Sequence, residues 1–516
     1  MRKAIWFLSL AGLFLFLSGC GSQSSMTPTT PTNPAVTTAP VGMTVTDTPP
    51  AGVTVLFFQL SITGATLTNS SGGSVSLLSS TNPIPINVSE LQTDTAFLGS
   101  QNVTAGTYSS LSLTFANPQL TIYNASDTAI GSTCAVGKVC NITPTTSGPL
   151  SMMFSSSPFP VTLSASSPLA FKLDIHLDTV IQSDLTLNLG ATNGVTVEEV
   201  KPPQSGGPIS AVGKFNGTVQ GTGTNQFTLQ TLEGRTFTIN VNSSTTYSGF
   251  PTSACSAQGF TCLAQGQAVQ VTVTLQTDGT LLATAVNFIQ LPTQQTVMGN
   301  IIGLSTSNGN TIMDLVIQAQ PMAANTAVLP VGRHASVTVP SAGVTFAINS
   351  GGFTLPPGLT FASASDLQVG QQVQVVVLGT VPPMSGSGSN TASTPGPVGP
   401  PDVLFTASSV TLEPSQITGT VAGTNAGALS FTLATLPVCF VPPAATANGA
   451  PNFGLPFIVT IQTTAATTFA NVTGIADLKA NDYVSVGGWV FSTPSGATKI
   501  TIAAKAVVER GVIPLF

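Results

Sequence analysis

The chain has 516 residues, of which only 6% are charged, and its 12 basic and 18 acidic residues give a net charge of −6. An average soluble domain is ~25% charged, so this surface depends on hydroxyl and amide groups for its solubility. The few cations exclude a basic surface for nucleic acid. The length predicts roughly three to four domains.

The first 19 residues are predicted to be an export signal. Arg2-Lys3 forms a short positive segment, and an apolar run from Ala4 to Leu17 follows it. This run is shorter than the ~20 residues of a membrane-spanning helix, which favours a cleaved signal. The chain is therefore expected to work outside the cytoplasm.

The run ends in Leu17-Ser18-Gly19-Cys20, which resembles the lipobox of bacterial lipoproteins. The resemblance implies cleavage before Cys20 and a diacylglyceryl group on its sulfur. Several acyl chains on Cys20 would make a lasting membrane anchor. Gly21-Ser22 supplies no aspartate to signal inner-membrane retention, so the outer membrane is favoured, on either face. The alternative is an ordinary secretory signal, with Cys20 free or trimmed away.

Residues 20–41 are predicted to be a flexible tether. This stretch is rich in serine, threonine and proline and has no apolar periodicity. Proline lacks a backbone donor and has a fixed φ, which disfavours helix and sheet alike. The lipid-anchored tether would lift the first domain off the membrane.

Residues 42–200 are predicted to form an antiparallel β-sandwich. Apolar and polar residues alternate over residues 53–57, 111–115 and 171–177, and period-two runs separated by turns are typical of stacked sheets. Asp47 precedes Thr48-Pro49 and is expected to be a turn residue rather than a ligand.

Four motifs of this domain form a recognisable series. They are Val45-Thr46-Asp47-Thr48-Pro49, Ile86-x-Val88-x-x-Leu91, Ala105-Gly106-Thr107-Tyr108 and Lys172-Leu173-Asp174-Ile175. The series resembles a bacterial lipoprotein family of unknown function whose domains open on a V-T-D-x-P stretch. The resemblance implies a fold and an envelope location, and no activity.

Asp174, His176 and Asp178 are the candidate metal ligands of this domain. They alternate with Leu173, Ile175 and Leu177, so a strand would place all three on one face. Neighbours on such a face stand ~6.6 Å apart, and a bound ion needs ligands from more than one strand. We therefore expect a solvated polar face, with no metal and no cofactor.

Residues 201–210 are predicted to be a linker, and a threefold repeat follows it. Each unit carries a frame of leucine, then a glycine or asparagine suited to positive φ, then an alternating strand. The frames are Leu263-Ala-Gln-Gly266-Gln-Ala-Val269-Gln-Val271, Leu367-Gln-Val-Gly370-Gln-Gln-Val373-Gln-Val375 and Leu478-Lys-Ala-Asn481-Asp-Tyr-Val484-Ser-Val486. The spacing is too long for a solenoid.

The repeats are predicted to be separate small β-barrel-like domains over residues 211–291, 296–413 and 415–512. A disordered insertion is expected at about 382–401. The pattern resembles a second bacterial family of unknown function, which occurs in tandem in exported proteins and is similar to small barrels that bind oligonucleotides or oligosaccharides. The whole chain is thus predicted to be all-β, a sandwich followed by three barrels.

Four cysteines are predicted to form two disulfide bonds, Cys134 with Cys140 and Cys255 with Cys262. In an oxidising compartment each pair can close a short loop. A zinc site is disfavoured, because the spacing is not Cys-x-x-Cys and the chain holds only two histidines. Cys439 is expected to be a buried, inert thiol.

The sequence motifs of common enzymes are absent. There is no Gly-x-Ser-x-Gly, no His-Glu-x-x-His and no phosphate-binding loop. A serine triad would have to use His176 or His334, and His334 is expected to be an exposed loop residue. Trp489 is expected to be a core residue at a strand kink, the alternative being an exposed binding anchor. No catalytic residue is assigned.

The sequence predicts a lipid-anchored cell-envelope protein with a non-catalytic binding, adhesive or structural role. Its partners would be the membrane, through Cys20, and envelope proteins or surface polysaccharide. Two alternatives are a carbohydrate- or small-ligand-binding protein and a hydrolase without a linear motif. An enzyme predicts a concave pocket with convergent polar groups, and a scaffold predicts none.

Overall fold

The computed structural model describes residues 38–512, with gaps. The gaps are 49–54, 79–81, 125–133 except 129, 166, 183, 203–207, 232–233, 252–254, 256, 290–293, 320–330, 379–400, 435–458 except two short strands, and 493–499. The predictions for the signal, Cys20, most of the tether, the insertion and Cys439 lie outside these residues. No helix in the described part of the chain has the length and apolarity needed to cross a membrane.

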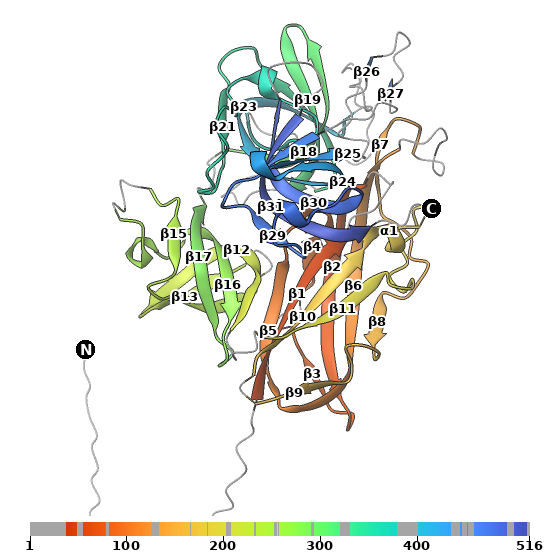
Figure 1. The fold of residues 1–516 in the computed structure, drawn as a ribbon, viewed down its shortest axis with the longest axis vertical. Coiled ribbons are helices and arrows are strands. Elements are labelled where there is room, and N and C mark those ends of the chain that lie inside the picture. Colours follow the sequence, from red (N-terminus) through yellow and green to blue (C-terminus); the bar gives the residue numbers. More distant parts are fainter. Residues whose placement is uncertain are drawn as a thin grey trace, which may run out of the picture. The chain divides into compact units, whose positions relative to one another are not determined.

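The N-terminal domain is built almost wholly from strands (Figure 1). Its elements are β1 (Thr38–Thr48), β2 (Val55–Asn69), β3 (Ser74–Ser76), β4 (Ile84–Asn87), η1 (Val88–Glu90), β5 (Ala96–Thr104), β6 (Gly106–Tyr123), β7 (Val139–Ile142), β8 (Ser151–Phe154), β9 (Val161–Leu163), β10 (Leu169–His176), α1 (Leu177–Val180) and β11 (Val195–Val200). The first strand begins at Thr38, inside the predicted tether, and Asp47 lies in that strand rather than in a turn.

Two sheets form this domain. One begins with the order β11-β10-β1-β5 and continues into the next domain, where β5 pairs with β12 (Ile209–Gly223). The other places β2 between β3 and β6, with β4 along β2 and β7, β8 and β9 along β6. The prediction of a purely antiparallel sandwich was wrong in one respect, because β1 pairs with β10 in parallel. Parallel pairing needs a long connection, and most of the domain lies between these two strands. Apolar side chains of both sheets share one core.

Repeat 1 and repeat 2 have equivalent elements. Repeat 1 comprises β12 (Ile209–Gly223), β13 (Gln226–Gln230), β14 (Thr236–Asn240), β15 (Thr246–Ser248), η2 (Phe260–Cys262), β16 (Ala268–Leu275) and β17 (Leu281–Ile289). Repeat 2 comprises β18 (Thr296–Ser307), β19 (Asn310–Ala319), β20 (His334–Val339), β21 (Thr345–Ile348), η3 (Ala364–Asp366), β22 (Gln372–Val377) and β23 (Val403–Glu413).

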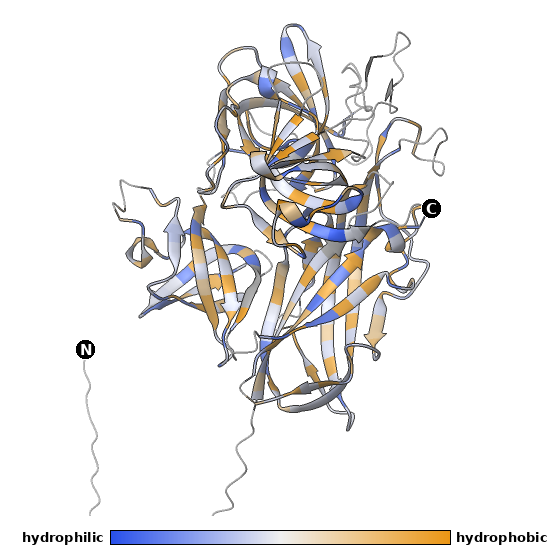
Figure 2. Ribbon diagram, in the orientation of Figure 1, coloured by the Kyte–Doolittle hydropathy of each residue, from blue (hydrophilic) through white to orange (hydrophobic). Residues whose placement is uncertain are grey.

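Repeat 3 follows the same order. It comprises β24 (Ser415–Asn425), η4 (Ala426–Ala428), β25 (Ser430–Ala434), β28 (Val459–Gln462), β29 (Thr468–Ala470), η6 (Ile475–Asp477), β30 (Asp482–Ser492) and β31 (Ile500–Val512), with the short pair β26 (Ala444–Ala445) and β27 (Pro451–Asn452) before β28. Figure 2 shows apolar and polar residues alternating along these strands, as expected where one face of a strand lines a core.

Repeats 2 and 3 each close into a small barrel, and repeat 1 has the same strand pairings within a larger sheet. In repeat 2 the strands pair in the order β20-β19-β18-β22-β23, and β23 returns to β20 in parallel. In repeat 3, β31 returns to β28, and in repeat 1, β17 returns to β14. A further short strand, β15, β21 or β29, runs parallel to the last strand. The barrels predicted for repeats 2 and 3 are confirmed, whereas the strands of repeat 1 belong to the large mixed sheet that begins in the N-terminal domain.

The repeated frame has the backbone that the sequence predicts. The central residue has φ +85° in Gly266, +89° in Gly370 and +73° in Asn481. Its amide donates to a carbonyl of the first barrel strand in every copy, namely Val219, Ile301 and Val421. The frame thus ties the turn before the fourth barrel strand to the first strand.

Candidate functional site: the junction segment

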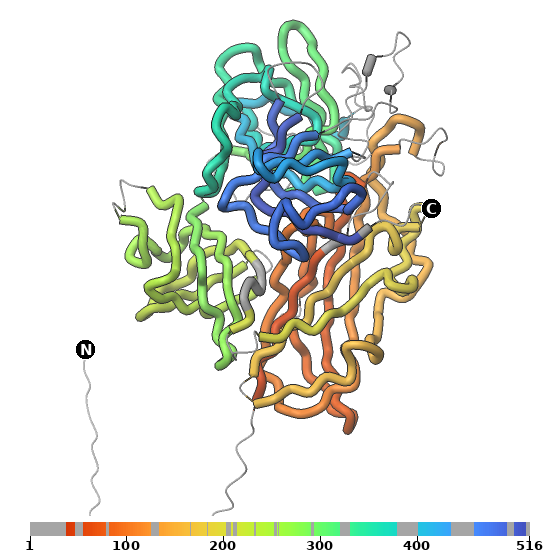
Figure 3. Tube along the Cα trace, viewed as in Figure 1, coloured from red at the N-terminus to blue at the C-terminus, as the bar shows by residue number. Residues whose placement is uncertain are grey.

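One segment of the N-terminal domain contacts all three repeats. This junction segment, residues 87–98, runs from the end of β4 through η1 into β5. The chain from Thr37 onward forms one compact unit, so the repeats are not independent domains joined only by linkers. Figure 3 follows the chain from this segment into the three repeats. The residues of this segment supply the candidate site.

Repeat 1 meets the junction segment through charge and aromatic packing. Lys214 Nζ lies 2.7 Å from Asp94 Oδ1, and Arg235 donates to the carbonyls of Phe97 (3.2 Å) and Leu98 (2.7 Å). The Phe97 ring lies 5.6 Å from that of Phe215 and belongs to the core of repeat 1. This arrangement fixes the repeat through an apolar anchor and a buried guanidinium.

Repeat 2 meets the segment through side-chain amides. Asn87 Nδ2 donates to the Gln318 carbonyl at 3.2 Å and to Gln318 Oε1 at 3.0 Å, while Gln318 Nε2 donates to the Leu56 carbonyl at 2.6 Å. Gln372 Nε2 donates to Glu90 Oε2 at 2.9 Å. Because Gln318 is 2% exposed, loss of these bonds would leave a buried amide unsatisfied.

A second contact of repeat 2 fixes its position on the N-terminal domain. Thr121 and Asn141 both donate to the carbonyl of Gly332, at 2.6 and 3.0 Å. A Cβ atom added at Gly332 would lie 2.7 Å from a ring carbon of Phe57. The apolar residues Leu56, Phe57, Ile302 and Val316 pack together beside this contact.

Repeat 3 contacts both the junction segment and repeat 2. Thr93 Oγ1 donates to Gln416 Oε1 at 2.6 Å, and Arg510 donates to the Gln92 carbonyl. Trp489, fully buried, stacks on Phe353 of repeat 2 at 5.3 Å and donates to the carbonyl of Asn349 at 3.0 Å. The core position predicted for Trp489 is confirmed, but the core is that of the neighbouring repeat 2.

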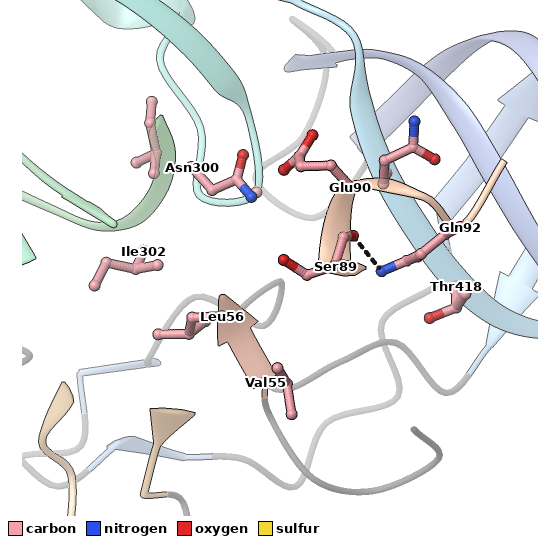
Figure 4. Close-up of a pocket in the computed structure, with 11 residues that line it drawn as sticks. Val55, Leu56, Ser89, Glu90, Gln92, Asn300, Ile302 and Thr418 are labelled. Atoms are coloured by element: carbon pink, nitrogen blue, oxygen red, sulfur yellow. Dashed lines mark hydrogen bonds between the residues drawn. The ribbon is translucent and has the colours of Figure 1, made fainter. Parts of the chain in front are cut away.

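A cavity of about 60 Å³ lies where these elements meet. Figure 4 shows Glu90 and Asn300 pointing toward one another at this cavity, with Leu56 and Ile302 on its apolar side. Asn300 Oδ1 and Gln92 Oε1 are buried and accept no hydrogen bond from the described residues. The space suits a few water molecules that would satisfy these acceptors, and it is too small for a sugar.

Burial raises the pKa of Glu90 from 4.5 to about 7. The nearby charge of Asp94 raises this pKa further, whereas the amides of Gln372 and Asn300 favour the ionised form and lower it. Glu90 lies at the junction of the N-terminal domain with repeats 2 and 3. Its protonation state therefore changes near neutral pH within a contact between domains.

A second buried glutamate ends the last strand of repeat 2. Both carboxylate oxygens of Glu413 accept from Asn349 Nδ2, at 2.9 and 3.2 Å. Burial raises the pKa of Glu413 to about 7, although the Asn349 bond and the charge of Lys505 lower it. Burial, followed by the charge of Lys214, lowers the pKa of Lys505.

The candidate metal ligands of the N-terminal domain do not converge. Strand β10 ends at His176, and Asp178 falls in α1, so the predicted common strand face does not reach it. Asp174 Oδ2 lies 3.9 Å from Arg510 instead, and His176 Nε2 lies 3.4 Å from Thr196 Oγ1. No cluster of three potential metal ligands occurs among the residues that the structure describes.

The prediction of an exposed His334 was wrong. His334 opens β20 and is 4% exposed, and its Nε2 lies 3.6 Å from Oδ1 of the fully buried Asp314. Neither atom has another hydrogen-bond partner in the described chain. Alternation could not have located Asp314, because Met313 to Gln318 are all buried and its imidazole partner comes from a separate strand. Among the described residues, no nucleophile is bonded to His334 as the third member of a catalytic triad.

The structure joins the four predicted cysteines as Cys134–Cys140 and Cys255–Cys262, with Cα atoms 5.6 and 5.5 Å apart. Sequence reasoning missed Glu90, Gln318, Gln372 and Arg510, because their partners lie hundreds of residues away in the chain. The sequence did contain a weak indication of Arg510, because charged residues are rare in this chain and a cation within a barrel strand needs an acceptor or an acidic partner.

Comparison with known families places this chain among proteins built from domains whose function is unknown. Residues 38–209 match the Domain of unknown function (DUF4382), and residues 216–287 and 458–492 match the Domain of unknown function (DUF5666). The chain therefore carries an N-terminal DUF4382 domain followed by DUF5666 domains. The predicted resemblance of both kinds of domain to families of unknown function is confirmed. No curated protein matches the chain.

Proposed function

We propose that this protein is a lipid-anchored component of the bacterial cell envelope with a non-catalytic, structural role. The observation that carries the proposal is the junction segment, which docks three repeats onto one N-terminal domain through hydrogen bonds, an ion pair and aromatic packing. A stalk or scaffold needs such fixed contacts between domains, whereas domains joined only by flexible linkers would lack them.

Two further observations support this role. The described cavity is small, and Glu90 is the one titratable residue in its lining, which is a poor constellation for acid–base chemistry. The paired cysteines suit an oxidising compartment. The lipobox-like Leu17-Ser18-Gly19-Cys20 supplies the proposed anchor.

The anchor is tested by comparing the wild-type chain with Cys20→Ala in bacterial cells. We expect the wild-type protein to fractionate with membranes and its first mature peptide to carry a lipid-modified Cys20 by mass spectrometry. The Cys20→Ala chain should lose the modification and leave the membrane fraction. An unmodified Cys20 in a wild-type chain cleaved elsewhere would overturn the anchor. Protease treatment of intact cells would then show on which side of the membrane the protein lies.

A further inference from the structure

Glu90 occupies an unusual position for a carboxyl group. It closes η1 of the N-terminal domain, and its closest described partners belong to repeat 2, where Gln372 donates to it at 2.9 Å. The cavity beside it is bounded by three domains, since its lining includes Leu56, Asn300 and Gln416. A charge at this point therefore acts on the contact between domains.

The surroundings of Glu90 offer little to balance a negative charge. Asp94 is the charged group on the same segment, and it disfavours ionisation of Glu90. Lys214 is engaged with Asp94 at 2.7 Å. On repeat 3, Arg510 donates to the Gln92 carbonyl and lies 3.9 Å from Asp174. Among the residues that the structure describes, amide groups of Gln372 and Asn300 are the remaining support for an ionised carboxylate.

We propose that protonation of Glu90 controls the docking of repeats 2 and 3 on the N-terminal domain, so that the junction is closed when Glu90 is neutral and loosened when it is ionised. A neutral carboxyl group can stay in the cavity at little cost and can donate to an unsatisfied acceptor such as Asn300 Oδ1. An ionised carboxylate gains more by reaching water, which requires the contact to open.

Opening would expose the apolar cluster Leu56, Phe57, Ile302 and Val316, which now packs at the contact between the N-terminal domain and repeat 2. An exposed apolar surface of this kind binds apolar partners. The device would thus couple the pH outside the cytoplasm to exposure of an apolar surface. It adds a regulatory property to the structural role proposed above and does not depend on the lipid anchor.

Hydrogen exchange of the full mature chain tests the proposal. Protection factors of the amides in residues 87–98 are measured at pH 5.5 and 8.5, after correction for the intrinsic exchange rate. Linkage between a pKa near 7 in the closed state and an ordinary carboxyl pKa in the open state predicts a loss of protection of about thirtyfold at the higher pH. In Glu90→Gln the loss should stay within about twofold.

Glu413→Gln is the matched control. Glu413 also titrates near neutral pH but binds Asn349 within repeat 2, so this variant should keep the response of the wild-type chain. An unchanged wild-type protection factor, or an equal loss in Glu90→Gln, would overturn the proposal. A response that disappears in Glu413→Gln alone would do so too.

A second variant keeps the proposal testable if Glu90→Gln does not fold. Gln372→Met removes the donor that favours ionised Glu90 and keeps the size of the side chain. The pH at which protection falls should therefore move upward relative to the wild-type chain. A midpoint that stays in place or moves downward would contradict the proposed control by Glu90.

Discussion

At the scale of single residues, the junction is fixed by side chains whose partners could not be found in sequence. Thr93 meets Gln416 across 323 positions, and Asn87 meets Gln318 across 231. The alternation of apolar and polar residues along a strand does not indicate such distant pairs. Even the buried His334 was misplaced by its Gly-Arg-His-Ala context, because burial depended on a neighbouring strand and not on the turn itself.

Gly332 gives the first prediction, at this scale. Its φ is +76°, and a Cβ there would meet Phe57 and Thr121 at 2.7 and 2.9 Å. Gly343 has φ +81°, and no atom lies within 4 Å of a Cβ built on it. Gly343→Ala should therefore cost about 1 kcal/mol from backbone strain, and Gly332→Ala about 3 kcal/mol because steric overlap adds to the strain.

Urea denaturation of both variants measures this difference. An equal loss of stability in the two would mean that Gly332 is not pressed against the N-terminal domain, which would contradict the contact described above.

At the scale of elements, much of the fold could be predicted. The frame of leucine, glycine and an alternating strand has a local cause, because the turn needs positive φ and the strand needs one apolar face. It was therefore visible in all three repeats, including Asn481, which has φ +73°. The parallel pairing of β1 with β10 was missed, since parallel partners are joined by no hairpin and carry no turn signal.

Gly266 tests the frame. Its φ is +85° and no atom lies within 4 Å of a Cβ built on it, so only backbone conformation is at stake. Gly266→Asn should be tolerated within about 1 kcal/mol, because asparagine adopts this conformation readily. Gly266→Val should cost about 2 kcal/mol. Equal effects of the two substitutions on the urea midpoint would argue against a conformational role for this glycine.

The disulfide Cys134–Cys140 gives a second prediction for an element. It closes a loop with a sequence separation of 6, for which the chain-entropy relation gives about 2 kcal/mol. The double variant Cys134→Ser, Cys140→Ser should be less stable by that amount. Reductant should destabilise the wild-type chain more than the double variant, and an equal response of both would show that the bond contributes nothing.

At the scale of the whole molecule, a protein with few charges places several of them between domains. Lys214, Arg235 and Arg510 each contact the junction segment, and two glutamates with raised pKa lie close by. Composition alone could predict an acidic, charge-poor surface but could not place these groups. The sequence suggested separate barrels because each repeat has its own core, yet Trp489 extends one core into the next.

The two glutamates predict an unusual dependence of stability on pH. Because their pKa is about 7 in the folded chain and 4.5 ordinarily, the folded state retains protons that the unfolded state releases between these values. Stability should therefore fall as the pH rises from about 4.5 to 7 and then level off, by about 3 kcal/mol for each group.

Urea midpoints between pH 4.5 and 8.5 measure this effect in the wild-type chain and in Glu90→Gln, Glu413→Gln. The double variant should be nearly flat across the window. Asp184, Asp278 and Asp477 have a lowered pKa, so their contribution is lost only when the pH falls toward and below their ordinary value of 3.8. A wild-type chain that gains stability from pH 4.5 to 7 would contradict the burial of the two glutamates.

The most direct test of docking is an engineered disulfide between the N-terminal domain and repeat 3. A Cβ built at Gly487 lies 3.4 Å from Thr93 Cβ, close to the spacing of a disulfide. Thr93→Cys, Gly487→Cys is made in a Cys439→Ser background, with Thr93→Cys, Gly474→Cys as the control, because nothing lies within 4 Å of a Cβ at Gly474. Peptide mapping under oxidising conditions should show near-complete linkage of 93 to 487 and none to 474. Absence of the 93–487 link in a folded chain would contradict the docked arrangement.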